Sequence, residues 1–289
     1  MSVLEETKFL MKKYKIKANK NLGQNFLIDD LAINDIVDGA NILENDLVIE
    51  IGPGLGSMTA ILLEKAKKVI CVELDKKMIK ILNDRFIAYS NIELINEDIL
   101  KLDLNSIIKE EKKKNKFQNV KIVANLPYYI TTPIIMKLLE SNLDIESITV
   151  MIQKEVADRL IEVPSGKNTG AITYTVYYYC ESSKIREVEN TSFIPMPEVK
   201  SEVINLKLRK EPAVQVENKK IFFSIIKCSY MQRRKTLING LVNTGVFKNK
   251  EEGIEILKTL GLREDIRAEN LTIEDFARLT NLFCQRVKK

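Results

Sequence analysis

A glycine-rich segment that follows an apolar run constrains the fold of this chain more than any other feature. The run from Leu47 to Ile51 predicts a buried strand, and Ser57 to Ala66 has the spacing of an amphipathic helix. Gly52, Gly54 and Gly56 lie between the two. Small residues there let a ligand approach the backbone, and a helix N-terminus offers unpaired N–H groups. The segment therefore predicts a nucleotide-type binding loop, with a purely structural tight turn as the other interpretation.

Strands and helices continue to alternate beyond this loop. Val69 to Glu73 predicts the next strand and completes a strand–helix–strand unit. Further strands are expected at residues 92–95, 120–124, 148–152, 174–180 and 203–208. The pattern indicates an α/β fold with a Rossmann-like, doubly wound and mainly parallel sheet. The charged run from Glu110 to Lys116 is expected to be a solvated connecting loop.

The strand pattern stops after Leu208, and the rest of the chain has helical periodicity. Helices are expected at residues 219–243, 250–260 and 272–286, with Gly261 after the second and Thr272 as the N-cap of the third. We therefore expect a cofactor-binding catalytic domain over residues 1–210, with a basic N-terminal arm. A small all-helical domain is expected over residues 211–289.

The composition excludes several kinds of chemistry. The chain has no histidine, which rules out imidazole metal ligands and Ser-His or Cys-His nucleophiles. Its four cysteines lie far apart without a CxxC pair, so we expect neither a metal site nor a disulfide framework. No apolar run reaches the roughly 18 residues of a membrane span, and the N-terminus lacks the apolar core of a secretory signal. These features predict a cytoplasmic globular protein without membrane contact.

Basic residues gather in two segments. Five lysines lie between Lys12 and Lys20, and a second group follows Gln232 on a predicted helix of the second domain. A net charge of +5 is by itself only a weak bias toward polyanions. Two separate basic segments nevertheless favour contacts with nucleic-acid phosphates, although charged helix faces are usually just solvated. The candidate phosphate contacts are Lys12, Lys13, Arg233, Arg234 and Lys235.

Two acidic residues follow predicted strands at the same edge of the sheet. Glu73 lies 21 residues after Gly52, a position from which a carboxylate in this architecture accepts hydrogen bonds from both ribose hydroxyls. Asp98 follows the third strand and is expected to face the same crevice. The ordinary interpretation of either residue is a solvated carboxylate at a strand end.

Asn125, Leu126, Pro127 and Tyr128 follow the fourth predicted strand and form the sharpest local motif. The lone pair of an adenine amino nitrogen is delocalised into the ring. An amide oxygen and a backbone carbonyl that accept hydrogen bonds from its two N–H groups would favour a pyramidal nitrogen. The lone pair would then point at a methyl donor, so alignment can replace a strong base. Pro127 would fix the turn and Tyr128 would stack on a flipped base, with Phe193 closing the other side of the pocket. An ordinary turn beside a core tyrosine is the other interpretation.

Eight segments spread over nearly the whole chain carry a resemblance to a known family. They are Asn21-Leu-Gly-Gln-Asn-Phe-Leu27, Glu50-Ile-Gly-Pro-Gly-Leu-Gly56, Val72-Glu-Leu-Asp75, Asn125-Leu-Pro-Tyr128, Gln153-Lys-Glu-Val156, Phe193-x-Pro-x-Pro197, Gln232-Arg-Arg-Lys-Thr236 and Arg267-Ala-Glu-Asn270. Together they resemble the KsgA/RsmA-type adenine dimethyltransferases of small-subunit (16S) ribosomal RNA. One departure is Glu198, where relatives usually carry Lys, and it affects only a local charge contact.

The resemblance implies a class I methyltransferase fold with S-adenosyl-L-methionine as the cofactor. The implied cofactor contacts are Asn25, Leu27, Gly52, Glu73, Asp98 and Asn125, together with Gly54 and Gly56 of the glycine-rich loop. Asn125, the Leu126 carbonyl, Tyr128 and Phe193 would hold the target adenine. The implied reaction is N6,N6-dimethylation of two adjacent adenosines near the 3′ end of 16S RNA. The enzyme would act as a monomer on the pre-30S particle, late in subunit assembly.

Three other functions are alternatives to this interpretation. The related Erm enzymes methylate large-subunit ribosomal RNA and usually have Ile where Leu126 stands. DNA adenine methyltransferases typically have Pro at that position. The chain could also act chiefly as an assembly factor whose binding matters more than its catalysis. The intact cofactor loop and the intact Asn-Leu-Pro-Tyr motif argue against a pure binding module.

Overall fold

The computed structural model describes residues 1–19, 22–166, 168–232 and 234–287, and its contacts divide the chain into two compact units. The first unit comprises Met1–Ala157 and Ser182–Leu208, and the second comprises Asp158–Glu181 and Arg209–Lys289. The sequence placed a single boundary near residue 210. Residues 158–181, which we had placed in the first domain, instead group with the C-terminal helices.

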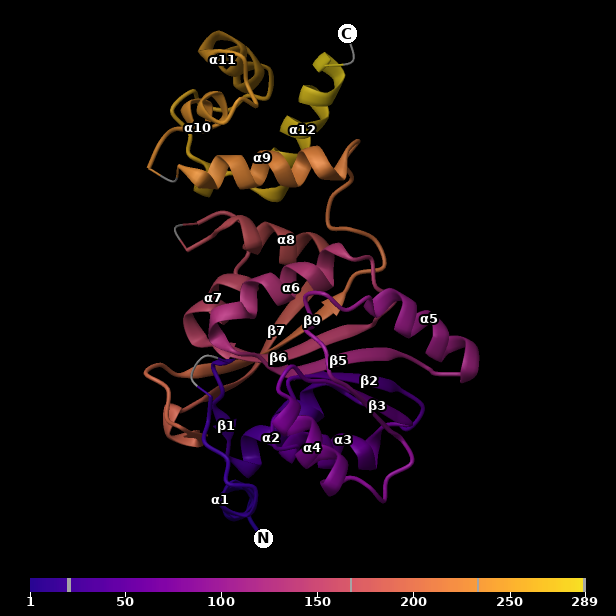
Figure 1. Ribbon diagram of the computed structural model, residues 1–289. Helices are drawn as coiled ribbons and strands as arrows, with labels where there is room; N and C mark the ends of the chain where they lie inside the picture. Colours follow the sequence, from indigo (N-terminus) through magenta and orange to yellow (C-terminus); the bar gives the residue numbers. More distant parts are fainter. Residues whose placement is uncertain (20–21, 167, 233, 288–289) are drawn as a thin grey trace. The chain divides into compact units, whose positions relative to one another are not determined.

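A seven-stranded sheet forms the centre of the first unit (Figure 1). Across the sheet its strands are β4 (Ile92–Ile95), β3 (Lys68–Val72), β2 (Leu47–Ile51), β5 (Val120–Asn125), β6 (Ser147–Gln153), β9 (Ser201–Leu208) and β7 (Cys180–Val188). The strands from β4 to β6 are parallel, and β9 is antiparallel to β6. The expected Rossmann-like, mainly parallel sheet is therefore confirmed. All five residues of β2 are buried, as its apolar run predicted.

Helices cover both faces of this sheet, as a doubly wound fold requires. Figure 1 shows α2 (Asp30–Gly39), α3 (Ser57–Lys65) and α4 (Lys76–Arg85) on one face, with α5 (Leu104–Lys114) and α6 (Thr131–Glu140) on the other. Asp29, Asp75 and Asp103 cap α2, α4 and α5 by accepting backbone N–H bonds. The N-terminal α1 (Val3–Lys13) begins with a capping box formed by Ser2 and Glu5. Two short strands, β1 (Phe26–Leu27) and β8 (Phe193–Ile194), pair antiparallel and form a separate two-stranded sheet.

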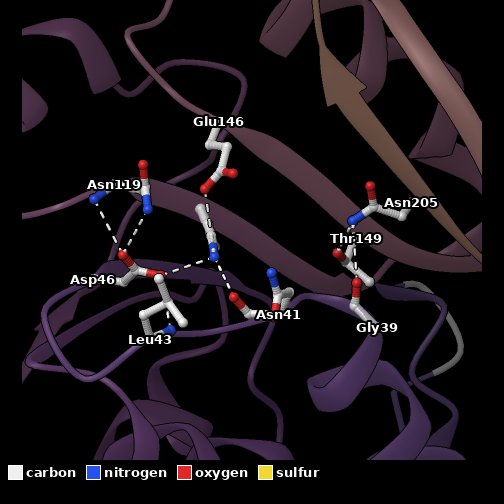
Figure 2. Close-up of polar contacts among 9 residues, drawn as sticks. Gly39, Asn41, Leu43, Asp46, Asn119, Glu146, Thr149 and Asn205 are labelled. Atoms are coloured by element: carbon white, nitrogen blue, oxygen red, sulfur yellow. Dashed lines mark hydrogen bonds and ion pairs between the residues drawn. The ribbon is translucent and has the colours of Figure 1, made fainter.

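A buried lysine ties together the amino-terminal ends of three strands (Figure 2). Lys121 of β5 is 1% exposed and forms ion pairs with Asp46 at 2.9 Å and Glu146 at 3.4 Å. Its ammonium group also donates to the backbone carbonyl of Asn41. Asp46 precedes β2 and Glu146 precedes β6, so the contacts fix the end of the sheet opposite the glycine-rich loop.

The second unit is helical and has its own hydrophobic core. It contains the second half of α7 (Lys154–Ile161), then α8 (Ala171–Tyr179), α9 (Lys219–Met231), α10 (Leu237–Asn243), α11 (Lys250–Thr259) and α12 (Ile273–Val287). Phe222, Leu241 and Phe276 are fully buried in this core. The predicted cap of the last helix is confirmed, because Thr272 Oγ1 accepts a hydrogen bond from the Asp275 N–H at 3.2 Å. None of the helices that the structure describes is long and apolar enough to span a membrane.

Two predictions of secondary structure were wrong. Residues 174–180 were expected to form a strand, but residues up to Tyr179 belong to α8 and the strand β7 begins only at Cys180. Tyrosine and valine favour strands, but here Tyr174 and Tyr178 lie one helical turn apart and both pack into the helical core. The charged run 110–116, expected to be a loop, contains the last five residues of α5, where Glu111 is buried and pairs with Lys68 at 2.7 Å.

The helix expected over 219–243 is divided into α9 and α10. Thr236 caps α10 by accepting a hydrogen bond from the Asn239 N–H, which starts a new helix rather than continuing the old one. Gln232, Arg234 and Lys235 therefore lie in the turn between the helices and not on a helix. Arg233 lies outside the residues that the structure describes.

Candidate active site

The candidate active site is a cleft at the carboxyl ends of β2, β3 and β5 in the first unit. Parallel strands that end at one edge of a sheet bring distant segments together there. Predicted site residues that line the cleft are Asn25, Leu27, Gly52, Gly54, Glu73, Asp98, Asn125, Leu126, Pro127 and Tyr128. The cleft encloses about 1200 Å³, including its open part. Most of the cofactor and catalytic residues that the sequence predicted therefore share one cavity.

The glycine-rich loop leaves the backbone open toward the cleft. A Cβ built on Gly52 would have the Asn125 carbonyl oxygen, at 3.9 Å, as its nearest neighbour, so the space beside Gly52 is vacant. Gly54 has a φ of +57°, a conformation that glycine adopts at no steric cost. Gly56 does not line the cleft: a Cβ there would come within 2.7 Å of the Phe86 ring. Gly56 packs closely against Phe86 and Leu82 at the end of α4, and its contact with the cofactor stays a prediction.

Glu73 joins this loop to the end of β3. Its carboxylate is 8% exposed and accepts hydrogen bonds from the N–H of Asp75 at 2.8 Å and of Gly54 at 3.3 Å. Burial raises the pKa of Glu73, and the two backbone donors act in the opposite direction. The carboxylate is thus held in place at the cleft wall with lone pairs left for further donors.

The polar segment after β4 supports the same wall. Asn96 donates to the carbonyls of Glu73 at 2.8 Å and Leu74 at 3.1 Å. Asp98 accepts the Leu100 N–H through Oδ1 at 2.9 Å and lines the cleft. The sequence missed the contribution of Asn96, because its side chain acts on a neighbouring strand end and not on the cleft itself.

The Asn-Leu-Pro-Tyr turn forms the opposite wall. Asn125, the last residue of β5, donates through Nδ2 to the carbonyl of Asn25 at 3.3 Å, which leaves Oδ1 as the acceptor of its amide. The Leu126 N–H donates to Met151 at 3.1 Å and fixes the start of the turn. The hydroxyl of Tyr128 lies 2.7 Å from Ser201 Oγ, and burial raises the pKa of this tyrosine. The geometry fits an amide acceptor beside a positioned aromatic ring.

Other predicted residues are not among those that line the cleft. Phe193 is 3% exposed, pairs with Leu27 across β1 and β8 and packs in the core of the first unit, so it does not close the cleft in this structure. Lys12 and Lys13 are exposed in the last turn of α1. Arg234 and Lys235 are exposed in the second unit.

The sequence also missed two polar residues around the cleft. Gln24 donates to Asp75 at 3.0 Å and accepts the Asn19 N–H at 2.9 Å, which fastens the segment before β1 to the start of α4. Glu50 lines the cleft from inside β2. A lone carboxylate in an apolar strand was the signal that could have identified Glu50, since such a residue is seldom buried without purpose.

The fold and the cleft define a class of enzyme. A glycine-rich loop and a ribose-type carboxylate stand on β2 and β3, an amide turn stands on β5, and the chain has no imidazole base. This combination is that of a Rossmann-like methyltransferase. The family model for ribosomal RNA adenine dimethylase matches residues 15–285, and the chain belongs to this family.

Individual relatives agree with the family. "Ribosomal RNA small subunit methyltransferase A" of Alkaliphilus oremlandii is 46% identical over 284 residues, covering 98% of each chain. The protein of the same name from Bacillus pumilus is 46% identical over 278 residues, covering 96% of this chain and 94% of its own. A crystal structure of a dimethyladenosine transferase from Plasmodium falciparum has a TM-score of 0.76 at 26% identity, covering 91% of this chain and 98% of that one. The 23S ribosomal RNA methyltransferase ErmE shares the fold, with a TM-score of 0.66 at 23% identity over 92% of this chain and 100% of that one.

The chain is accordingly an adenine dimethyltransferase of ribosomal RNA, and its cofactor is S-adenosylmethionine. The residues present fit this cofactor: Gly52 leaves vacant space against the backbone, and Glu73 offers a fixed carboxylate of the kind that binds ribose hydroxyls. When bound, the cofactor supplies a methyl group already activated by a sulfonium. The protein therefore has to orient the acceptor nitrogen and exclude water, and a histidine base is unnecessary.

Proposed function

We propose that this enzyme dimethylates N6 of two adjacent adenosines near the 3′ end of small-subunit ribosomal RNA. The observation that carries the proposal is the meeting of Asn125 and Tyr128 with Gly52 and Glu73 in one cleft. It is supported by relatives 44–46% identical over nearly the full length that are named for the small subunit. The pre-30S particle, late in assembly, is the proposed substrate, and a cytoplasmic monomer is the proposed form of the enzyme.

In the proposed arrangement, the cofactor and the target base approach each other from opposite walls. Glu73 and Asp98 bind the adenosine part of the cofactor, with Asn25, Leu27, Gly52 and Gly54 around it. Asn125 Oδ1 and the Leu126 carbonyl accept the two N–H bonds of the target amino group, and Pro127 fixes the turn that carries both. Because those acceptors favour a pyramidal nitrogen, its lone pair is directed at the methyl group.

The second methyl transfer sets a further requirement. The pocket must admit an amino group that already carries one methyl, and rotation about the C–N bond must present the nitrogen again to a fresh cofactor. In the second transfer the nitrogen has only one N–H left, so it donates a hydrogen bond to only one of the two acceptors. The proposed phosphate contacts are basic residues: Lys12 and Lys13 on α1, and Arg233, Arg234 and Lys235 of the proposed helical RNA-binding domain.

Mass-spectrometric mapping of modified adenosines in cells that lack this protein tests the proposal. We expect dimethyladenosine to disappear from two adjacent positions of small-subunit RNA and to return when purified enzyme and S-adenosylmethionine are added to immature small subunits. Loss of a modification from large-subunit RNA instead would overturn the proposal. Unchanged RNA, combined with normal subunit binding, would show that binding and not catalysis is the main activity.

A further inference from the structure

Tyr129, the residue after the Asn-Leu-Pro-Tyr turn, differs sharply from its neighbour Tyr128. The Tyr128 hydroxyl is held by Ser201, whereas the Tyr129 side chain is 58% exposed. Within the described ranges of the chain, the Tyr129 hydroxyl has no hydrogen-bond partner. Both rings line the cleft. One tyrosine is therefore anchored inside the cleft and the other stands at its opening.

Gly23 determines where the Tyr129 ring stands. A Cβ built on Gly23 would lie 3.0 Å from Cδ1 and 3.1 Å from Cε1 of this ring, and 3.3 Å from Cβ of Pro127. Gly23 has a φ of +60°, so its backbone packs directly against the ring where any larger residue would displace it. The ring thus packs against the Gly23 backbone on one side, while more than half of the side chain is exposed to solvent. Such preorganisation reduces the entropy that a bound partner must overcome.

We propose that Tyr129 stacks on the RNA base that flanks the target adenosine. The inference rests on the proposed function, because it requires the target base in the cleft. Extruding a base from a strand leaves its neighbour without a stacking partner on one side. An exposed aromatic ring at the opening replaces that partner, and it does so for any base because every base has a π face. Tyr129 thereby holds the strand in register and does not read its sequence.

A chemical double-mutant cycle on the full-length enzyme tests this contact. The protein variants are Tyr129→Ala and Tyr129→Phe, and the RNA in immature small subunits is either intact or lacks the base 5′ or 3′ of the target. RNA affinity, cofactor affinity and single-turnover rate are measured for each pair. Tyr129→Phe is the matched control, because it keeps the ring and removes only a hydroxyl that bonds to none of the described residues.

We expect Tyr129→Ala to bind intact RNA about 5- to 150-fold more weakly, the range that corresponds to one base–aromatic stack, while Tyr129→Phe binds as the wild type does. Removing the flanking base that stacks on Tyr129 should lower the RNA affinity of the wild type as much as Tyr129→Ala does. It should leave the RNA affinity of Tyr129→Ala unchanged, because that variant already lacks the aromatic ring. Cofactor affinity should change much less than RNA affinity.

Additive losses in the variant and at both abasic positions would overturn the inference, since the ring and the base would then act independently. So would a loss of cofactor affinity as large as the loss of RNA affinity, which would make Tyr129 a wall of the cofactor site. A wild-type enzyme that transfers no methyl group to small subunits would contradict the proposed function instead. The binding cycle still tests Tyr129 in that case, because stacking contributes to affinity without turnover.

Discussion

The hydroxyl of Thr59 donates a 2.6 Å hydrogen bond to the carboxylate of Glu50, nine residues earlier in the chain. Both side chains are fully buried, and the thiol of Cys71 donates to the same carboxylate oxygen at 3.5 Å. The other oxygen, Oε1, has no hydrogen-bond partner among the described residues. Burial raises the pKa of Glu50 to about 7; the charge of Glu73 adds to this effect, while Thr59, Cys71 and Arg85 oppose it.

This pKa predicts a stability that decreases as the pH rises. Between its ordinary pKa of 4.5 and about 7, Glu50 binds more protons in the folded state than in the unfolded state. The free energy of unfolding therefore falls across this window, by up to about 3 kcal/mol from this group. Glu50→Gln, which keeps an acceptor for Thr59, should gain stability relative to the wild type from pH 5 to pH 8. Urea denaturation at pH 5 and pH 8 measures the free energy of unfolding of both proteins. The same difference between variant and wild type at both pH values would contradict a raised pKa of Glu50.

The buried ion pair of Lys121 should matter far more than an exposed one. Lys121→Ala leaves the fully buried Asp46 without its cation, and we expect a loss of about 3–5 kcal/mol in the free energy of unfolding. The control is Lys65→Ala, whose pair with Asp38 at 2.7 Å has side chains 43% and 66% exposed. That pair should contribute less than about 1 kcal/mol. Similar losses in the two variants would show that the N–H groups of Leu43 and Asn119, which also donate to the Asp46 carboxylate, satisfy it without Lys121.

These contacts also show what the sequence could and could not predict. β2 and β5 were predictable because they are mostly apolar segments of a parallel sheet, and their carboxyl ends had to meet. Lys121 lies within β5, but local periodicity cannot reveal that it forms ion pairs with Asp46 and Glu146 at the end of the sheet. Long-range polar pairing leaves no local pattern.

The errors have related causes. The strand predicted at 174–180 failed because tertiary packing of Tyr174 and Tyr178 outweighs their strand propensity. Phe193 was placed beside the pocket because it lies in a proline-stiffened loop, but its side chain packs in the hydrophobic core of the first unit. The cleft residues Glu73 and Asn125 were found because strand ends and motif spacing are both visible along the chain.

The open backbone at Gly54 should be specifically required for cofactor binding. Gly54→Val adds a branched side chain at a φ of +57° in the cleft wall, and we expect S-adenosylmethionine binding to be lost in calorimetry. Gly245→Val is the matched control, because it has a φ of +75°, lies in the second unit and has no atom within 4 Å of a built Cβ. It should lower stability comparably yet leave cofactor affinity intact. Normal affinity in folded Gly54→Val would remove the loop from the cofactor site.

Exposed cations of the second unit are expected to contribute to RNA binding through phosphate contacts. Arg234→Ala with Lys235→Ala should lower the slope of log affinity against log salt by about 0.9 per contact on duplex RNA, or about 0.7 on a single strand. Arg263→Ala is the control, because Arg263 is already paired with Asp265 at 2.6 Å. Filter binding at several salt concentrations gives the slopes. An unchanged slope in the double variant would mean that these two residues are merely solvated.

Asn125 should act mainly in the transition state. Its amide oxygen is most valuable after the amino nitrogen has become pyramidal, so Asn125→Ala should slow methyl transfer more than it weakens cofactor or RNA binding. Losing one positioned hydrogen-bonding group in a dry pocket costs about 2.7–4 kcal/mol, or roughly a hundred- to a thousandfold in rate. Asn205→Ala is the control, because that amide bonds to Thr149 at 2.7 Å and lies outside the cleft (Figure 2). Single-turnover rates at saturating cofactor separate an effect on methyl transfer from an effect on cofactor binding. A near-normal rate in Asn125→Ala would show that another group aligns the nitrogen.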